Sequence, residues 1–224
     1  MKKLITIIFA IFATMTVSSQ AVERAFGINL SYAGIDTQVK DDIDSNGTTD
    51  TTKDITNDVG IASIFLEVSN SFGDRGHIAF GVDYIPFSAE WESRSTTQTS
   101  MTTSTTETSG TNKGNVEVDG HTTIYIQPGI TMANDVILYG TLAYVTADAE
   151  ADVQSVSSTD KTVDLSMDGT KYGFGLKKST GFGFVKLEYA STEYDTLSTT
   201  TSNNTKVTAD MDVDFVTLSI GKSF

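Results

Sequence analysis

The chain alternates apolar and polar positions with a period of two in eight separate stretches. In the last stretch, apolar side chains at Val216, Leu218 and Ile220 alternate with small or polar ones, and the chain ends on Phe224. Because successive side chains of a strand point to opposite faces, this alternation predicts strands that are apolar on one face only. The expected strands cover about residues 24–34, 59–69, 78–85, 121–130, 136–145, 170–177, 182–194 and 213–224.

The connections between these stretches are sorted by length. Long polar tracts at residues 36–58, 88–120, 147–168 and 195–210 alternate with short turns at residues 70–76, 131–135 and 178–181. A soluble sandwich has no reason to sort its connections in this way, whereas outer-membrane barrels combine short periplasmic turns with long external loops. The sequence therefore predicts an all-β fold, an eight-stranded antiparallel up-and-down transmembrane β-barrel. Its loops are expected to be extracellular, and an even strand count places both termini on the periplasmic side.

The pattern leaves three local features open. In the stretch 136–145, Leu138, Leu142 and Tyr144 form the favoured outward set, but the opposite phase is nearly as apolar. Pro128 lacks an amide donor, so we expect a local bulge where it interrupts the fourth strand. The Thr-rich segment 95–106 fits either a disordered loop or strands that continue beyond the membrane.

Aromatic residues cluster near the ends of the expected strands. The ends next to long tracts carry Tyr32, Tyr84, Phe87, Trp91, Tyr144, Tyr189 and Tyr194. The ends next to short turns are expected to carry Phe26, Phe72, Tyr172, Phe182 and Phe224. Two such belts favour a barrel that crosses a membrane, since amphipathic rings prefer the two interfaces.

Composition narrows the class of protein further. The 224 residues contain no cysteine, which excludes disulfides and thiolate metal sites. The net charge of −14 argues against nucleic acid as a partner and against binding of an anionic lipid surface through a basic patch.

The first residues have the pattern of an export signal. Lys2 and Lys3 precede an apolar run at residues 4–17, and Ser19 and Ala21 supply small residues for cleavage. We therefore predict a cleaved signal peptide at residues 1–21 and a single barrel domain at residues 22–224.

With these features together, the chain resembles the small eight-stranded outer-membrane barrels of the OmpA-transmembrane, OmpX and opacity-protein type. The resemblance rests on the export signal, the eight alternating segments and the terminal Phe224. Lys222 departs from it, because this family commonly has an aromatic or apolar residue there. The resemblance implies a location in the bacterial outer membrane among lipid and lipopolysaccharide. It also implies an assembly signal read by the barrel-assembly machinery, formed by Val216, Leu218, Ile220 and Phe224.

The predicted register turns several charges toward the barrel interior, or lumen. An eight-stranded barrel is just wide enough for side chains to fill, so a wide pore is not expected. Buried charges are costly unless they are paired. We therefore predict a cross-barrel ion network of Glu67, Asp83, Lys171, Lys186 and Glu188. It would act either as a plug that rigidifies the barrel or as the lining of a narrow, gated conduit.

The first long tract contains half of a calcium-binding loop. Asp42, Asp44, Asn46 and Asp50 occupy positions one, three, five and nine of the pattern. Gly47 stands at position six, but Lys53 replaces the bidentate glutamate at position twelve. Weak binding of Ca²⁺ or Mg²⁺ by the extracellular loops is one interpretation, and a solvated acidic turn is the other. No other cofactor is expected.

Little in the sequence indicates an enzyme. The two histidines, His77 and His121, are expected at opposite ends of the barrel, and His121 is interpreted as an ordinary surface residue. We therefore predict no enzymatic activity. The favoured function is a structural and surface-interaction role through acidic, Thr-rich extracellular loops that meet an unknown extracellular ligand. The alternative is a narrow channel for ions or small, including apolar, solutes.

Overall fold

The computed structural model describes residues 22–42, 47–87, 89–90, 94–101, 107–154, 161–200 and 206–224. The signal peptide predicted at residues 1–21 lies outside this range and stays a prediction. No helix in the described part of the chain is long and apolar enough to cross a membrane.

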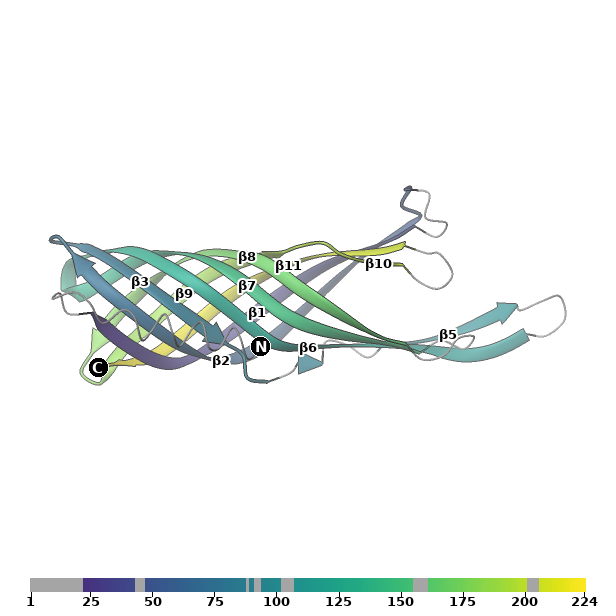
Figure 1. The fold of residues 1–224 in the computed structure, drawn as a ribbon, viewed down its shortest axis with the longest axis horizontal. Helices are drawn as coiled ribbons and strands as arrows, with labels where there is room; N and C mark the ends of the chain where they lie inside the picture. The colour runs from purple at the N-terminus through teal and green to yellow at the C-terminus, as the bar shows by residue number, and fades with distance from the viewer. Residues whose placement is uncertain are drawn as a thin grey trace.

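Eight antiparallel strands form a closed ring in which neighbours in sequence are neighbours in space (Figure 1). They are β1 (Glu23–Asp42), β2 (Thr51–Phe72), β3 (Gly76–Tyr84), β6 (Glu107–Thr131), β7 (Val136–Gln154), β8 (Lys161–Thr180), β9 (Gly183–Tyr194) and β11 (Lys206–Ser223). The ring closes because β11 pairs with β1, from Ala25 opposite Ser223 to Asp42 opposite Lys206. The predicted eight-stranded up-and-down barrel is confirmed.

The apolar positions of the strands face outward, as the alternation predicts. Leu30, Leu142 and Leu187 each leave more than half of their surface exposed, at 53%, 57% and 54%. In β7 the favoured phase is confirmed, since Leu138, Leu142 and Tyr144 are exposed. The alternative set faces inward, with Tyr139, Ala143 and Val145 buried.

Two aromatic residues were placed wrongly by the sequence. Tyr172 was expected near the short turns, but Phe174 lies opposite Tyr189 and Tyr172 is two residues further toward the long connections. Tyr172 therefore belongs to the outer belt. Tyr194 was expected in the aromatic belt at the ends next to the long tracts. Its ring instead faces the interior and packs against a buried apolar cluster.

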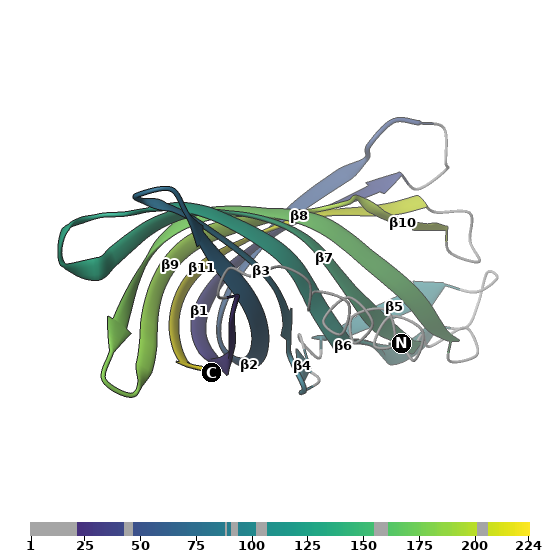
Figure 2. The same cartoon turned by 60° about the vertical axis from the view of Figure 1, so that its left-hand side comes forward.

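Beyond the ring, the strands continue as two separate arms (Figure 2). The pairing of β2 with β3 ends at Ile64–Tyr84, and that of β8 with β9 ends at Gly169–Tyr194. Past these rungs, one arm contains β1, β2, β11 and the short β10 (Leu197–Thr200). The other arm contains β6, β7, β8 and the short strands β4 (Ala89–Glu90) and β5 (Arg94–Met101). The long polar tracts are thus largely strand. In the Thr-rich segment 95–106, residues 95–101 belong to β5, so the strand alternative is confirmed for them.

The bulge expected at Pro128 lies elsewhere. The register of β6 with β3 runs unchanged through Pro128 opposite Ile78. On the β7 side, the register before Pro128 is the same as the register after it. The residue pairs at Pro128 and next to it are missing, because proline has no amide hydrogen to donate. The shift of one residue falls between Asp119 and Thr122, where Gly120 adopts a φ of 65°. A left-handed residue of this kind is typical of bulges.

The chain end is fixed to the first strand. The Phe224 amide donates to the Arg24 carbonyl at 2.9 Å, and the rings of Phe26 and Phe224 lie 6.1 Å apart. Short turns join the strands at this end of the ring (Figure 1), and the 3₁₀ turn η1 (Ala133–Asp135) is one of them. The exposed side chains of Val216, Leu218, Ile220 and Phe224 all lie on the outer surface.

Candidate functional site

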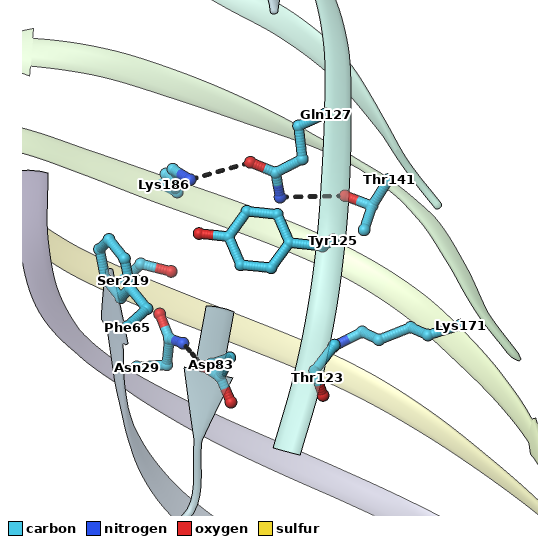
Figure 3. Close-up of a pocket in the computed structure, with 10 residues that line it drawn as sticks. All are labelled: Asn29, Phe65, Asp83, Thr123, Tyr125, Gln127, Thr141, Lys171, Lys186 and Ser219. Atoms are coloured by element: carbon cyan, nitrogen blue, oxygen red, sulfur yellow. Dashed lines mark hydrogen bonds between the residues drawn. The ribbon is translucent and has the colours of Figure 1, made fainter. Parts of the chain in front are cut away.

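The lumen next to the short turns is filled by aromatic rings that fit against glycines. A Cβ atom at Gly81 would overlap the ring of Tyr125, and one at Gly175 would overlap the ring of Tyr139. Gly27 with Phe65 and Gly221 with Phe184 repeat the relation. Two small cavities nearby measure about 40 and 30 Å³, which is room for no more than a few water molecules. Figure 3 shows the side chains around the first cavity.

Glu67 on β2 is the centre of a buried charge cluster. Its side chain is fully buried, and Lys177 of β8 donates to Oε1 at 3.0 Å. Lys186 of β9 contacts Oε2, and the Tyr125 hydroxyl donates to the same oxygen at 3.1 Å. Removing a charge from water costs free energy, and this cost is offset only when the charge finds an opposite charge and hydrogen bonds. The arrangement around Glu67 supplies both.

A neutral side chain connects this cluster to a second carboxylate. The Gln127 amide oxygen accepts from Lys186 at 2.9 Å (Figure 3). The Gln127 amide nitrogen donates to Glu188 at 2.9 Å. The Thr141 hydroxyl also donates to Glu188, at 2.7 Å, and Lys171 lies 3.8 Å from its other oxygen. A continuous chain of polar contacts therefore crosses the lumen from Lys177 to Lys171.

Asp83 sits beside this chain, bound by hydrogen bonds rather than by an ion pair within the described residues. Ser63 donates to its carboxylate at 2.7 Å, and the amide of Asn29 donates to the same oxygen. Counted together, the carboxylates of Glu67, Asp83 and Glu188 balance three lysines, Lys171, Lys177 and Lys186. We call these six residues the ion network.

The lysines of the ion network also lie over aromatic faces. The Lys177 ammonium is 4.1 Å from the centre of the Phe184 ring, and the Lys171 ammonium is 4.7 Å from that of Phe215. Lys186 has four rings between 5.4 and 5.6 Å, from Phe65, Tyr125, Tyr139 and Phe184. Cation–π attraction strengthens when water is excluded, so these rings stabilise lysines as well as fill space.

The structure places all five predicted network residues inside the barrel and adds others. Sequence reasoning left out Lys177, although it shares the inward phase of Lys171 on β8. It also left out Tyr125 and Gln127. The bulge expected at Pro128 obscured the inward phase of Gln127, whose role depends on partners from two other strands.

The predicted cation loop lies partly outside the described residues, which include Asp42 and Asp50 but not Asp44 or Asn46. The Asp42 side chain accepts a hydrogen bond from the Gly47 amide at 2.8 Å. Among the described residues, no group of three His, Asp or Glu side chains could hold a metal ion. Binding of Ca²⁺ or Mg²⁺ here stays a prediction.

The two histidines point into the lumen. His77 is buried near the short-turn end, with 4% of its surface exposed. His121 is not the surface residue that the sequence indicated, because its Nε2 atom is hydrogen-bonded to the Tyr194 hydroxyl at 2.9 Å. Both rings face inward because the alternation of β3 and β6 turns them there.

Comparison with known proteins adds three distant structures. No protein-family model and no curated protein matches the chain. The chain is similar to Ail, the attachment invasion locus protein of Yersinia pestis, solved in complex with the heparin analogue sucrose octasulfate. The identity is 15%, the match covers 88% of this chain and 98% of that one, and the TM-score is 0.38. Neisserial surface protein A matches at 10% identity over 84% and 96% of the two chains, with a TM-score of 0.26. A Pseudomonas aeruginosa FadL homologue matches at 7% identity over 89% and 90%, with a TM-score of 0.30.

These TM-scores are too low for an argument about function. The fold is established by this chain's own strand pairing, above all by the rungs between β1 and β11. That pairing gives the chain the eight-stranded up-and-down architecture of the small outer-membrane barrels.

Proposed function

We propose that the protein is an integral outer-membrane barrel with a closed lumen, which presents its two strand arms outside the cell. The ion network carries this proposal. Its three lysines and three carboxylates balance one another and are held by side chains from seven of the eight ring strands. A lumen built in this way stiffens the ring and leaves little room for solute.

The outer surface supports the membrane location. Large apolar side chains that are 40% or more exposed include Ile28 on β1, Ile64 on β2, Phe80 on β3, Ile124 on β6, Leu142 on β7, Phe174 on β8, Leu187 on β9 and Leu218 on β11. Soluble monomers rarely expose a continuous apolar surface of this extent. An apolar band around all eight strands fits the hydrocarbon core of a bilayer.

The arms support a surface-interaction role. They extend from the end of the ring opposite the short turns, so in a barrel with periplasmic turns they lie outside the cell (Figure 1). In the arm of β1, β2 and β11, acidic and hydroxyl side chains are exposed to solvent, as at Thr51, Thr52 and Asp54 of β2. Such a surface suits polar partners, including lipopolysaccharide and its bridging divalent cations. The narrow channel is the weaker alternative, because the lumen cavities beside the ion network measure only about 40 and 30 Å³.

Planar-bilayer recording on the purified full-length protein tests the closed lumen. We expect no steady conductance from the wild type. The variant Glu67→Ala, which removes the shared partner of Lys177 and Lys186, should raise the frequency of openings. Glu193→Ala, on the exposed face of β9, is the matched control and should stay silent. Steady openings from the wild type that Glu67→Ala leaves unchanged would support the channel instead.

Location is tested separately by cell fractionation. The folded protein should appear in outer-membrane fractions as a band whose gel mobility changes on boiling. Recovery in the soluble periplasmic fraction would contradict the proposal.

A further inference from the structure

Beyond the ion network, the side chains that face the lumen change from polar to apolar. On the side of the arms, its inward side chains form an apolar cluster from four strands. The cluster contains Ala33, Ile35, Ala147, Met167, Met211, Val213 and Phe215. Val59, Ile61, Tyr194 and Leu197 pack against it.

This cluster lines a cavity of about 420 Å³, which we call the outer cavity. Its lining comes from both arms, with Ile35 and Val213 on one side and Ala147 and Met167 on the other. Ligand pockets typically measure about 300–1,000 Å³ and are mostly apolar with a few polar groups. The outer cavity is therefore large enough for a small organic molecule, unlike the cavities of the ion network.

A polar atom without a partner in the described residues lies at the floor of the outer cavity, and a second lies in the cavity next to it. His121 lines it, and its Nε2 atom is occupied by Tyr194, but among the described residues its buried Nδ1 atom has no partner. Thr192 lines the adjoining cavity of about 30 Å³, which shares His121 and Phe215 with the outer cavity. Its buried hydroxyl also lacks a partner in the described part of the chain. A buried polar group without a hydrogen bond costs free energy, which a ligand's polar group offsets.

The charged side chains below the floor of the outer cavity already have partners. Lys171 pairs with Glu188, and Asp83 accepts from Ser63. Asp58 also lines the outer cavity, on its exposed side, where its carboxylate is hydrogen-bonded to Tyr32. At the floor a charged ligand group would meet no unpaired opposite charge among the described residues, whereas a neutral carbonyl or hydroxyl group can bond to His121.

We propose that the outer cavity binds a small apolar molecule that carries one neutral hydrogen-bonding group. The molecule enters from the external medium between the two arms, where the ring is no longer closed. It stops at the ion network, so the site binds and does not transport. The inference rests on the proposed membrane location only for the side from which the ligand arrives.

Photolabelling with benzophenone tests this proposal, because the probe has an apolar body and a single carbonyl acceptor. The full-length protein in lipid nanodiscs is irradiated with the probe, and mass spectrometry maps the labelled residues. We expect saturable labelling of Met167 and Met211. The variant Ala147→Phe fills the cavity from β7 and should reduce that labelling at least fivefold. Thr146→Phe, which faces outward one residue away, should leave it unchanged.

The outcomes separate the proposal from its alternatives. A second filling variant, Val213→Phe, replaces Ala147→Phe if that variant fails to show the folded band on an unboiled gel. Labels confined to lipid-facing residues, or labels that neither filling variant reduces, would overturn the proposal. Labelling of the two methionines by a benzophenone carried on a lipid acyl chain, with none by the free probe, would assign the cavity to membrane lipid and also overturn it. An absence of conductance in bilayer recordings tests the closed lumen and does not test ligand binding in the outer cavity.

Discussion

The barrel interior has a polar half, which contains the ion network, and an apolar half, which surrounds the outer cavity. The same strands contribute to both halves, but with side chains of opposite polarity. β11 shows the contrast on a single face. Thr217 and Ser219 lie in the polar half, whereas Met211 and Val213 lie in the apolar half. In the polar half the ring is closed, so side chains from seven strands meet and satisfy one another's charges and hydrogen-bonding groups. In the apolar half the wall divides into arms, and fewer strands face each other.

The comparison teaches that charge burial depends on a complete ring. Glu67 needs Lys177, Lys186 and Tyr125 from three different strands. Only a closed barrel brings these strands within hydrogen-bond distance of one point. Where closure ends, apolar side chains fill the interior without needing specific partners.

The largest expected effect comes from breaking the ion network at its centre. Glu67→Gln leaves Lys177 and Lys186 buried without a counter-charge, which should lower the free energy of unfolding by about 3–5 kcal/mol. Urea titration in detergent micelles, followed by the folded band on unboiled gels, measures this. Glu193→Gln on the outer face is the control and should change stability by less than about 0.5 kcal/mol. Equal stability of Glu67→Gln and the wild type would contradict the role of the network.

The fit of rings against glycines is tested next. Gly81→Ala introduces a Cβ atom into the ring of Tyr125, and overpacking of this kind typically costs about 1–3 kcal/mol. Gly60→Ala on β2 is the matched control, because no atom lies within 4 Å of the added carbon. The same urea titration compares the two. A larger loss in Gly60→Ala would show that strand propensity, and not lumen packing, determines the cost.

A single change of polarity probes the apolar half. Val213→Thr places a hydroxyl in the outer cavity at nearly constant shape and should cost about 1–2 kcal/mol, the range for a buried hydroxyl without a partner. Thr217→Val, four residues along the same face, removes the hydrogen bond between the hydroxyls of Thr217 and Ser31 at 2.8 Å. It should cost about 0.5–1.5 kcal/mol. A neutral Val213→Thr would mean that water fills the outer cavity.

The smallest effect belongs to the exposed arm. A hydrogen bond from Thr196 and the nearby Lys40 ammonium hold the pKa of Asp210 below its usual value. Because the folded-state pKa is the lower one, the contribution is complete above about pH 4 and is lost as pH falls through that lower pKa. Solvent screening keeps it below about 0.5 kcal/mol. Hydrogen exchange of the β1–β11 rungs at pH 6 and pH 3 should show faster opening at pH 3. In Asp210→Asn this pH difference should be reduced.

The sequence predicted much of the lumen because alternation fixes which side chains face inward. Glu67, Asp83, Lys171, Lys186 and Glu188 all follow from a period of two within one strand. The alternation does not predict which residues of different strands come into contact. That Gln127 joins Lys186 to Glu188 depends on the register of β6 against β7 and on β9 facing β6 across the lumen. Pro128 in β6 suggested a bulge, so the residues alone did not predict that register.

Local sequence by itself determined the eight strands, their outward apolar faces, the sorting of long and short connections and the terminal Phe224 on the outer surface. These features depend on neighbours along one strand, whose geometry is the same in every sheet. The tertiary structure alone decided how far the strands continue, where the ring splits into arms, and which lysine meets which carboxylate. Those outcomes depend on contacts between residues far apart in the chain, and a one-residue shift between strands would have changed every one of them.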